Sequence, residues 1–488
     1  METSARSWSF RPDAVAPGVP LGDRYVGFFG VVLLGYAVAG RGFAYLGVPP
    51  LFIGEVALAY GLVALARVRQ RTGVLSVGPL GVVALLVAWA VARVLLGLPT
   101  WGIDAARDGM LVVYALFALI AAGLVLEKPE RLRLLVGRYG VVVWGLILIG
   151  WPVHFLLRVV EVFPVWPWAG VPIIQTKPGD LLVHLAMAAT FVTVGFQKPR
   201  PALVVGLVVG ILGLMVTSRG GMLGFLMGVG LASLWKPAAA RFGRFVYVGA
   251  VLAVLGVAVG STGLTVNNGD REFSVGQIWE NVLSIAGKSD DAMLQNTAEW
   301  RLEWWKDIVG YTFGGAHFLD GKGFGINLAT DDGYKVDEEE SLRSPHNSHL
   351  TVLARGGVPM FLVWLLVQGL WFLTVARSAI RARLTGLDGW AAFYAVCGAF
   401  WLGAHVNASF DVYLEGPMGA IWFWTVFGLA LAGTRLQKTH PHLLDDLRQS
   451  DRRPTAPAWS WTPSAPDAPS SPVSHDADPR PAAPFSWS

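Results

Sequence analysis

The chain has 488 residues, of which 54% are hydrophobic and 15% charged, and its mean hydropathy is +0.51. Soluble domains carry about a quarter charged residues, so this composition indicates an integral membrane protein and excludes an ordinary soluble enzyme. The net charge of +4 does not indicate a nucleic-acid partner, because the basic residues lie mainly in short loops between apolar segments.

Residues 1–23 have no apolar core followed by a small-residue cleavage site, so we expect a cytoplasmic N-terminal segment and no removed signal peptide. The apolar segments that follow, measured against a hydrocarbon layer of about 30 Å, predict about twelve spans. The expected spans are 25–40, 51–66, 79–96, 109–126, 141–157, 181–196, 202–217, 222–235, 245–260, 358–376, 390–406 and 417–433. The predicted fold class is therefore all-α, a polytopic transmembrane helix bundle built from residues 24–260 and 348–433.

Basic residues follow every even-numbered span, for example Arg67 and Arg69 after the second and Arg435 after the twelfth. The positive-inside rule then places both termini in the cytoplasm and the polar loop 261–347 outside. The single cysteine, Cys397, lies in an apolar segment, so we expect no intrachain disulfide in that loop. The last segment, 434–488, turns rich in Pro, Ser, Ala and Asp, which predicts a disordered cytoplasmic tail.

Polar side chains recur at the span ends that should face outward. These candidates for substrate binding are Asp104, Arg107, Lys177, Asp180, His184 and Asp411. Charges near membrane depth are costly and usually face a cavity or a partner, which makes them functional candidates. The alternative for each is a structural ion pair, or a side chain that reaches to the membrane interface.

Arg219 lies where two half-length apolar segments meet, in the sequence Ser218-Arg219-Gly220-Gly221. A guanidinium offers a planar fork suited to two phosphate oxygens, and adjacent glycines let a ligand approach closely. We therefore predict that Arg219 binds an anion. A tight turn with an arginine at the interface remains the alternative.

Within the outer loop, Trp300, Trp304 and Ile308 recur at helical spacing, with Arg301 beside this stripe. Tryptophans at that spacing are typical of a short interfacial helix lying on the membrane surface. Arg301 is then free to face an anion. The acidic run over 331–340 is interpreted as a solvated loop in preference to a divalent-cation site, and no His or Cys spacing indicates zinc.

His346 closes the loop in the sequence Pro345-His346-Asn347, just before an apolar segment. An imidazole with a near-neutral reference pKa can take a proton from a hydroxyl, which makes His346 a candidate general base. Asn347 could orient the ring or a substrate. An inert loop histidine is the alternative that chemistry alone leaves open.

The order of these motifs resembles that of the O-antigen ligase and polymerase superfamily. The resemblance covers about 203–372 and rests on Ser-Arg-Gly-Gly between two spans, Arg301 with Trp304 and Trp305, Gly-Lys-Gly-Phe-Gly at 321–325, and His346-Asn347 followed by Gly356-Gly357. Two departures are Met360, where the ligases have a small residue or Tyr, and Trp305, where they tend to have Leu. Both favour a polymerase or a broader relative over a ligase.

The resemblance implies a GT-C-type membrane glycosyltransferase in the inner membrane of a bacterium. Its donor would be an undecaprenyl-diphosphate-linked oligosaccharide, and its other partners an acceptor glycan, membrane lipid and polysaccharide export proteins. His346 would activate the acceptor hydroxyl, Arg219 and Arg301 would hold the diphosphate, and no metal or cofactor is implied. The alternatives are a transporter or flippase of lipid-linked glycan or small anions, and a non-catalytic scaffold.

Overall fold

The computed structural model describes residues 19–69, 71–157, 159–160, 163–238, 266–268, 271–273, 292–335 and 342–448. The expected span 245–260, most of the outer loop before residue 292 and the tail after residue 448 lie outside the described residues. Residues 336–341, which include the second half of the acidic run, also lie outside the described residues.

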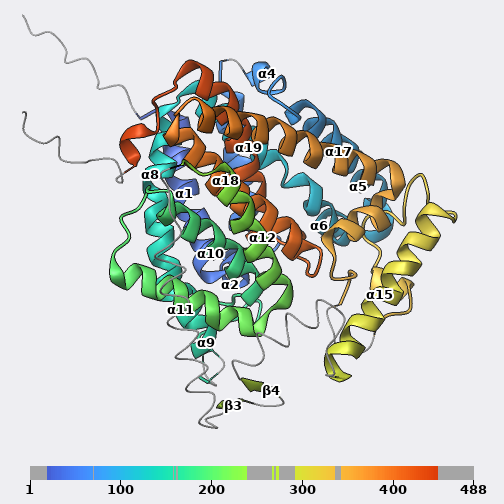
Figure 1. Ribbon diagram of the computed structural model, residues 1–488. Helices are drawn as coiled ribbons and strands as arrows, with labels where there is room; N and C mark the ends of the chain where they lie inside the picture. The colour runs from blue at the N-terminus through green and yellow to red at the C-terminus, as the bar shows by residue number, and fades with distance from the viewer. Residues whose placement is uncertain are drawn as a thin grey trace, which may run out of the picture. The chain divides into compact units, whose positions relative to one another are not determined.

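The described chain is a bundle of α-helices joined by mostly short connections (Figure 1). Its first half forms α1 (Leu21–Ala39), α2 (Arg41–Ala44), α3 (Ile53–Ala66), α4 (Arg71–Val74), α5 (Leu80–Trp101), α6 (Ile103–Val113), α7 (Leu116–Glu127), α8 (Glu130–Gly145), the π-helical turn η1 (Leu146–Gly150) and α9 (Trp151–Leu156). Its second half forms α10 (Pro178–Thr193), α11 (Pro201–Thr217), α12 (Arg219–Trp235), α15 (Ala292–Phe313), α16 (Leu328–Asp331), α17 (Ser348–Leu384), α18 (Asp388–Ala408), α19 (Pro417–Thr439) and the 3-10 turn η2 (Asp445–Leu447). Two short antiparallel pairs complete it, β1 (Gly47–Val48) with β2 (Leu51–Phe52) and β3 (Val266–Asn268) with β4 (Arg271–Phe273).

Every expected span within the described residues overlaps a helix or a helix pair. Six helical segments are long and apolar enough to cross a membrane: α1, α5, the continuous α8 to α9, α17, α18 and α19. The pair α6 and α7, bent by 43°, would make a seventh, and α3, α10 and α11 are apolar but shorter. The structure confirms a mostly helical membrane protein, while the count of twelve spans stays a prediction.

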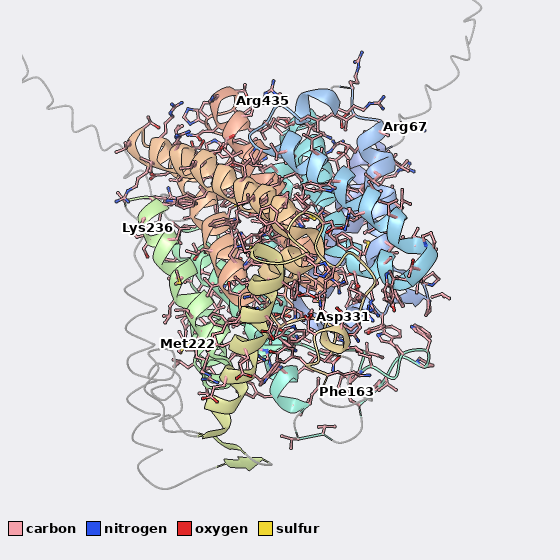
Figure 2. The ribbon with its side chains drawn as sticks, turned by 90° about the vertical axis from the view of Figure 1, so that its right-hand side faces the viewer. Arg67, Phe163, Met222, Lys236, Asp331 and Arg435 are labelled. Carbon is pink, nitrogen blue, oxygen red and sulfur yellow. The ribbon has the colours of Figure 1, made fainter. Side chains whose placement is uncertain are left out.

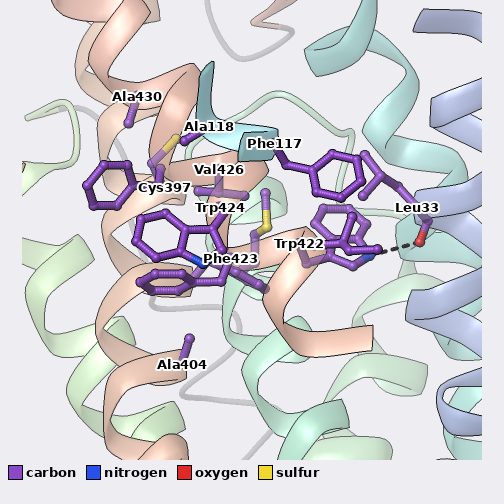
Figure 3. Close-up of a cluster of buried hydrophobic side chains, with 14 of the residues drawn as sticks. Leu33, Phe117, Ala118, Cys397, Ala404, Trp422, Phe423, Trp424, Val426 and Ala430 are labelled. Atoms are coloured by element: carbon purple, nitrogen blue, oxygen red, sulfur yellow. Dashed lines mark hydrogen bonds between the residues drawn. The ribbon is translucent and has the colours of Figure 1, made fainter. Parts of the chain in front are cut away.

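The core of the bundle surrounds α18 and α19 (Figure 3). Trp422 of α19 donates a hydrogen bond from Nε1 to the Leu33 carbonyl of α1 at 2.8 Å. In the same helix, Gly428 lies so close to the Ala118 carbonyl of α7 that a side chain would collide with it. A buried indole whose N–H is satisfied gains apolar burial without the cost of a lone donor. These contacts fix α19, and with it the loop 409–416 that precedes it.

Glycines spaced four residues apart bring α12 against α18. Gly224 of α12 packs on the Gly403 carbonyl, which an added Cβ would approach to 2.8 Å. Gly228, one turn further on, packs still more closely on the Ala399 carbonyl, which an added Cβ would approach to 2.4 Å. At the start of the helix an added Cβ on Gly220 would come within 2.9 Å of Phe410. Small residues at helical spacing allow this close approach between membrane helices, and here they place the first turn of α12 beside the loop after α18.

The turn between α11 and α12 matches the expected break at Ser218. Ser218 has extended backbone angles and accepts a hydrogen bond from the Gly221 N–H at 3.2 Å, which is an ordinary N-cap. Arg219 is therefore the first residue of α12.

The long helix α17 is two helices joined at Gly357, whose φ of 71° only glycine adopts without strain. The glycine motif 321–325 wraps around this joint, and its Lys322 N–H donates to the Ala354 carbonyl at 2.7 Å. Just before the motif, the Phe318 carbonyl accepts from the Val358 N–H at 2.8 Å. The motif therefore supports the backbone of α17 and satisfies the groups that the break leaves without helical partners.

The tryptophan stripe of α15 packs against protein, whereas the sequence predicted that it would face lipid, and the interfacial position of the helix stays a prediction. Trp304 and Ile308 are both 0% exposed and pack with Leu353 of α17 and Leu328 of α16 in a separate apolar cluster. Figure 1 shows α15 beside the first part of α17. The sequence spacing identified a buried face correctly, but it could not tell a protein neighbour from a lipid one.

The basic loops and the polar loop lie toward opposite ends of the bundle. Arg67 and Arg435 lie at one end, and Asp331 and Phe163 toward the other (Figure 2). At the basic end the helix α19 continues past the expected boundary at residue 433 to Thr439. Arg448 is 5% exposed and pairs with Asp388 at 3.0 Å, so residues up to 448 fold onto the bundle.

Candidate active site

Three contacts fix the backbone around His346. The Asn347 side chain accepts hydrogen bonds from the His349 and Leu350 N–H groups, both at 3.1 Å, and so caps the start of α17. The Pro345 carbonyl accepts a hydrogen bond from Trp305 Nε1 at 2.9 Å, which ties the segment to α15. Asn347 therefore has a clear structural role, whether or not it also contacts a substrate.

His346 itself has a left-handed backbone, with φ of 52°, and it is the one non-glycine residue with positive φ among those described. Such strain persists only where the surroundings impose it, and it is found often at functional sites. The imidazole is 29% exposed and meets the Trp300 ring edge to face, at 6.4 Å between centroids. The ring is thus held in place and still reachable from solvent.

Asp411, in the loop between α18 and α19, faces this imidazole. Its Oδ1 lies 3.6 Å from His346 Nδ1 and 2.7 Å from Lys177 Nζ, and it also accepts from the Val412 N–H at 2.7 Å. Burial by itself would raise the pKa of Asp411, but the imidazole, the lysine charge and the backbone N–H together hold the pKa well below its ordinary value. Asp411 is therefore a carboxylate, and an imidazole with Nδ1 toward a carboxylate has Nε2 left for a substrate.

Asp180 supports this group from the first turn of α10. Its Oδ1 accepts a hydrogen bond from Asn407 Nδ2 of α18 at 3.1 Å, and its charge interacts with Asp411 and Lys177. The contact joins α10 to the end of α18, so the loop that carries Asp411 is anchored at its start.

Arg301 and the start of α12, where Arg219 lies, both contact Phe410, the residue before Asp411. Arg301 Nη1 donates to the Phe410 carbonyl at 3.3 Å, and Phe410 also packs on Gly220, next to Arg219. Burial is the main cause that lowers the pKa of Arg301, and the charge of Arg219 lowers it further, against the opposing effect of Asp411. Two guanidinium groups whose charges act on each other near a partly buried position favour the binding of an anion.

A polar cleft of about 490 Å³ opens on another side of His346. Cations predominate in its lining, which contains Arg41, Arg107, Lys177, Arg343 and Arg355 together with the acids Asp108 and Glu415. Burial raises the pKa of Glu415, although the neighbouring Ser344, Arg355, Thr351 and His346 oppose this. The cleft is large enough to hold part of a sugar chain and favours a negatively charged one.

A network of ion pairs forms the wall of the cleft. Asp108 of α6 lies 2.9 Å from Arg355 Nη1 and 3.3 Å from Arg343 Nη2, and it accepts from the Gly325 N–H at 3.0 Å. Asp104 lies 3.1 Å from Arg107 and 3.5 Å from Arg343. The network ties α6, the glycine motif and α17 together beside His346.

Residues 202–365 match the family model of the O-antigen ligases. The match supports membership of the O-antigen ligase and polymerase superfamily. The matched segment carries Arg219, Arg301 and His346, whereas Lys177 and Asp411 lie outside it. No curated protein matches the chain. This match and the apolar helices together support a multi-pass protein of the bacterial inner membrane with a glycosyltransferase-like role in polysaccharide biosynthesis.

The structure brings most of the sequence-predicted site residues together. Asp411 faces His346 and pairs with Lys177, and Arg301 binds the carbonyl of the neighbouring Phe410. Arg107 lines the cleft, and Asp104 pairs with Arg107. His184 lies apart: it is 3% exposed and packs between the rings of Phe400 and Trp422 in the core.

Sequence reasoning missed three arginines of the cleft. Arg355 is 2% exposed within an apolar segment, and such a buried charge is itself a signal of a partner or a cavity. Arg41 follows an odd-numbered span, where the positive-inside rule predicts few cations, so it too could have been noticed. Arg343 precedes the His346 motif by only two residues but carries no pattern of its own.

No cluster of three or more metal-ligating side chains occurs among the residues that the structure describes. In the acidic run, Asp331 and Asp332 both pair with Lys322, and Asp332 accepts from Trp304 Nε1 at 2.5 Å. These two carboxylates are thus engaged within the protein.

Proposed function

We propose that this protein transfers a glycan from a polyprenyl-diphosphate-linked donor to a hydroxyl group of an acceptor glycan, at the outer face of the inner membrane. The observation that carries the proposal is the position of His346. A carboxylate faces its Nδ1, a pair of arginines lies on one side, and a cleft lined mainly by cations lies on another.

In the proposed reaction the acceptor hydroxyl oxygen attacks the anomeric carbon of the donor sugar. The bond between that carbon and the diphosphate oxygen breaks, and the configuration at the carbon is inverted. His346 Nε2 takes the hydroxyl proton, and the adjacent Asp411 carboxylate stabilises the imidazolium that forms. The lipid diphosphate leaves with the bonding electron pair.

Arg219 and Arg301 are assigned to the diphosphate. Fixed cations that meet charge as it develops on a leaving group lower the barrier without solvent reorganisation, and the loss of one such donor typically costs about 10²–10³ in rate. The partial burial of Arg301 supports this role, because a desolvated cation interacts more strongly with an anion.

The cationic cleft is assigned to the acceptor. Its excess of arginine and lysine suits an acceptor that itself carries negative charge, such as a repeat unit still attached to its own lipid diphosphate. This favours chain extension over ligation, in agreement with the residues at Met360 and Trp305. Polysaccharide export proteins remain expected partners.

The test is complementation of a gene deletion with His346→Ala, Arg219→Ala and wild-type protein at matched abundance in the membrane. We expect both variants to lose long surface polysaccharide and to accumulate lipid-linked repeat units. His442→Ala and Arg377→Ala are the matched controls, because both residues are exposed and lie outside the site. Normal long glycan with either site variant would overturn the catalytic assignment.

Purified protein with lipid-linked repeat unit then separates the possible activities. A ladder of longer lipid-linked products indicates polymerisation, and a product formed only with a second, non-repeat acceptor indicates ligation. Movement of intact repeat unit across a vesicle membrane, without any new glycosidic bond, would instead establish a flippase.

A further inference from the structure

A second site lies at the basic end of the bundle, away from His346. An apolar groove of about 220 Å³ runs between α1 and α8 and is closed at its base by α10, α18 and α19. Its lining includes Gly27 and Gly30 of α1 and the ring of Trp422. An added Cβ on either glycine would meet no atom within 4 Å, so these two positions leave room along the groove.

A basic pocket adjoins the groove and shares three lining residues with it, namely Val26, Leu134 and Arg138. Its other charged lining residues are Lys128, Arg131, Arg133, Asp23 and Glu130. The site therefore joins an apolar channel to a charged mouth, which is the shape and polarity of a lipid with a charged headgroup.

The charges of the pocket are not all satisfied by the protein. Arg131 pairs with Asp23 at 2.7 Å, Lys128 pairs with the same carboxylate at 2.8 Å, and Arg133 pairs with Asp446. Arg138, at the seam between pocket and groove, makes no hydrogen bond or ion pair within the described part of the chain. It is the cation that has capacity for a ligand.

Arg138 lies three residues before the expected span 141–157, and its side chain is exposed. A cation at the end of a span is placed where it can meet the charged headgroup of a lipid. Basic pockets between membrane helices on the cytoplasmic side bind anionic lipid headgroups for this reason.

We propose that this site binds one anionic phospholipid of the cytoplasmic leaflet, with its phosphate on Arg138 and one acyl chain in the groove beside Gly27 and Gly30. The basic loops at this end assign it to the cytoplasmic side, where anionic phospholipids attract such residues. The site is independent of the chemistry at His346. Because it contacts α19 through Trp422, an occupied groove also stabilises the helix that follows the Asp411 loop.

The test uses full-length protein in detergent, stripped of lipid and titrated with phosphatidylglycerol or phosphatidylcholine of identical acyl chains. Bound lipid is counted by native mass spectrometry, and the melting temperature is followed in parallel. We expect wild-type protein to bind one phosphatidylglycerol at least fivefold more tightly than phosphatidylcholine, and to melt at a higher temperature when it is bound.

Two variants probe the two halves of the site. Arg138→Gln is expected to lose the fivefold preference, and Gly30→Phe to lose the tight binding event for both lipids because the ring fills the groove. The matched controls are Arg377→Gln, an exposed cation of α17, and Gly369→Phe, where an added Cβ likewise meets open space. Both controls should bind lipid as wild type does.

Equal affinity of wild-type protein for the two lipids would overturn the proposal, and so would unchanged binding in either site variant. Undecaprenyl phosphate is added as a competitor. If it displaces phosphatidylglycerol at a lower concentration than phosphatidylglycerol itself requires, and Arg138→Gln abolishes this, then the occupant is a polyprenyl lipid and the phospholipid assignment is wrong. Melting without added lipid checks that each variant is folded.

Discussion

Two groups of arginines lie near His346, and they differ in what surrounds them. Arg355 and Arg343 face Asp108, so the protein itself supplies their counter-charge. Arg301 makes no ion pair within 4 Å among the described residues and donates to a backbone carbonyl, and its nearby charges are the Asp411 carboxylate and the Arg219 guanidinium. The first group is built as part of the fold, whereas Arg301 of the second group is held by a backbone carbonyl and not by an ion pair.

This difference separates two uses of a charge in a membrane protein. A buried ion pair holds helices in register and is disrupted when one partner is removed, because the other charge is left without compensation. A partly buried cation held only by backbone contacts lowers the stability of the protein when no ligand is bound. Binding of an anion then raises that stability again. Substitution in the first group should therefore affect folding, and substitution in the second should affect activity.

The largest expected effect is on folding, from Asp108→Asn. It leaves Arg355, whose side chain is 3% exposed, without its carboxylate, and we expect a loss of roughly 3–5 kcal/mol in the free energy of unfolding. Reversible unfolding in mixed detergent micelles measures this loss. Asp104→Asn is the matched control, because its carboxylate is 40% exposed and its loss should cost less than about 1 kcal/mol. Equal losses for both variants would remove the distinction between the two groups.

The next effect is on activity, from Arg301→Gln. We expect the rate of glycan transfer to fall by about 10²–10³ while the free energy of unfolding changes by less than about 1 kcal/mol. The control is Lys306→Gln, which removes an exposed cation from the same helix. Glycan transfer by purified protein, measured beside its unfolding, tests both parts. A variant that keeps its activity but unfolds easily would show that Arg301 belongs with the structural group.

Much of the fold could be predicted from the sequence, because apolar segments of sufficient length have few alternatives to membrane helices. The break at Ser218 and the candidate roles of Arg219 and His346 were also visible, since unusual residues interrupt otherwise apolar sequence there. Glycines at 220, 224 and 228 follow a spacing of four that could have predicted the contact of α12 with α18.

The rest depended on contacts between distant parts of the chain. Nothing local indicates that Trp305 reaches the Pro345 carbonyl, or that the buried side of the α15 stripe is α17. The pairing of Arg355 with Asp108 joins residues almost 250 positions apart, and one sequence does not reveal such pairs. The sequence identifies charged residues as candidates for the site, but only the structure shows which of them form ion pairs within the protein and which do not.

A smaller effect is expected from Trp305→Phe, which removes the hydrogen bond to the Pro345 carbonyl. We expect a loss of about 1 kcal/mol in stability and roughly a tenfold loss of activity, because the strained backbone of His346 is no longer held. Trp390→Phe is the control, since it removes a similar bond to the His440 carbonyl, away from the site. Equal activity in the two variants would mean that the bond does not position His346.

The smallest effect concerns pH and Asp411, the carboxylate that faces both His346 and Lys177. Its pKa is lowered in the folded protein, so its contribution to stability is complete above the unfolded-state pKa of about 3.9 and is lost as the pH falls through the lower folded-state pKa. Between roughly pH 5 and pH 3 we expect the stability difference between wild type and Asp411→Asn to shrink by on the order of 1 kcal/mol. Unfolding curves across that range measure it.

Asp104→Asn again serves as the control, and its stability difference from wild type should change less over the same range because its carboxylate is more exposed. Parallel profiles for wild type and Asp411→Asn would mean that the imidazole and lysine do not hold the carboxylate ionised. If the difference does shrink as expected, Asp411 keeps its charge at every pH above that range. The stabilisation that it offers an imidazolium at His346 is then constant, and any loss of transfer activity between pH 5 and pH 7 must come from another group.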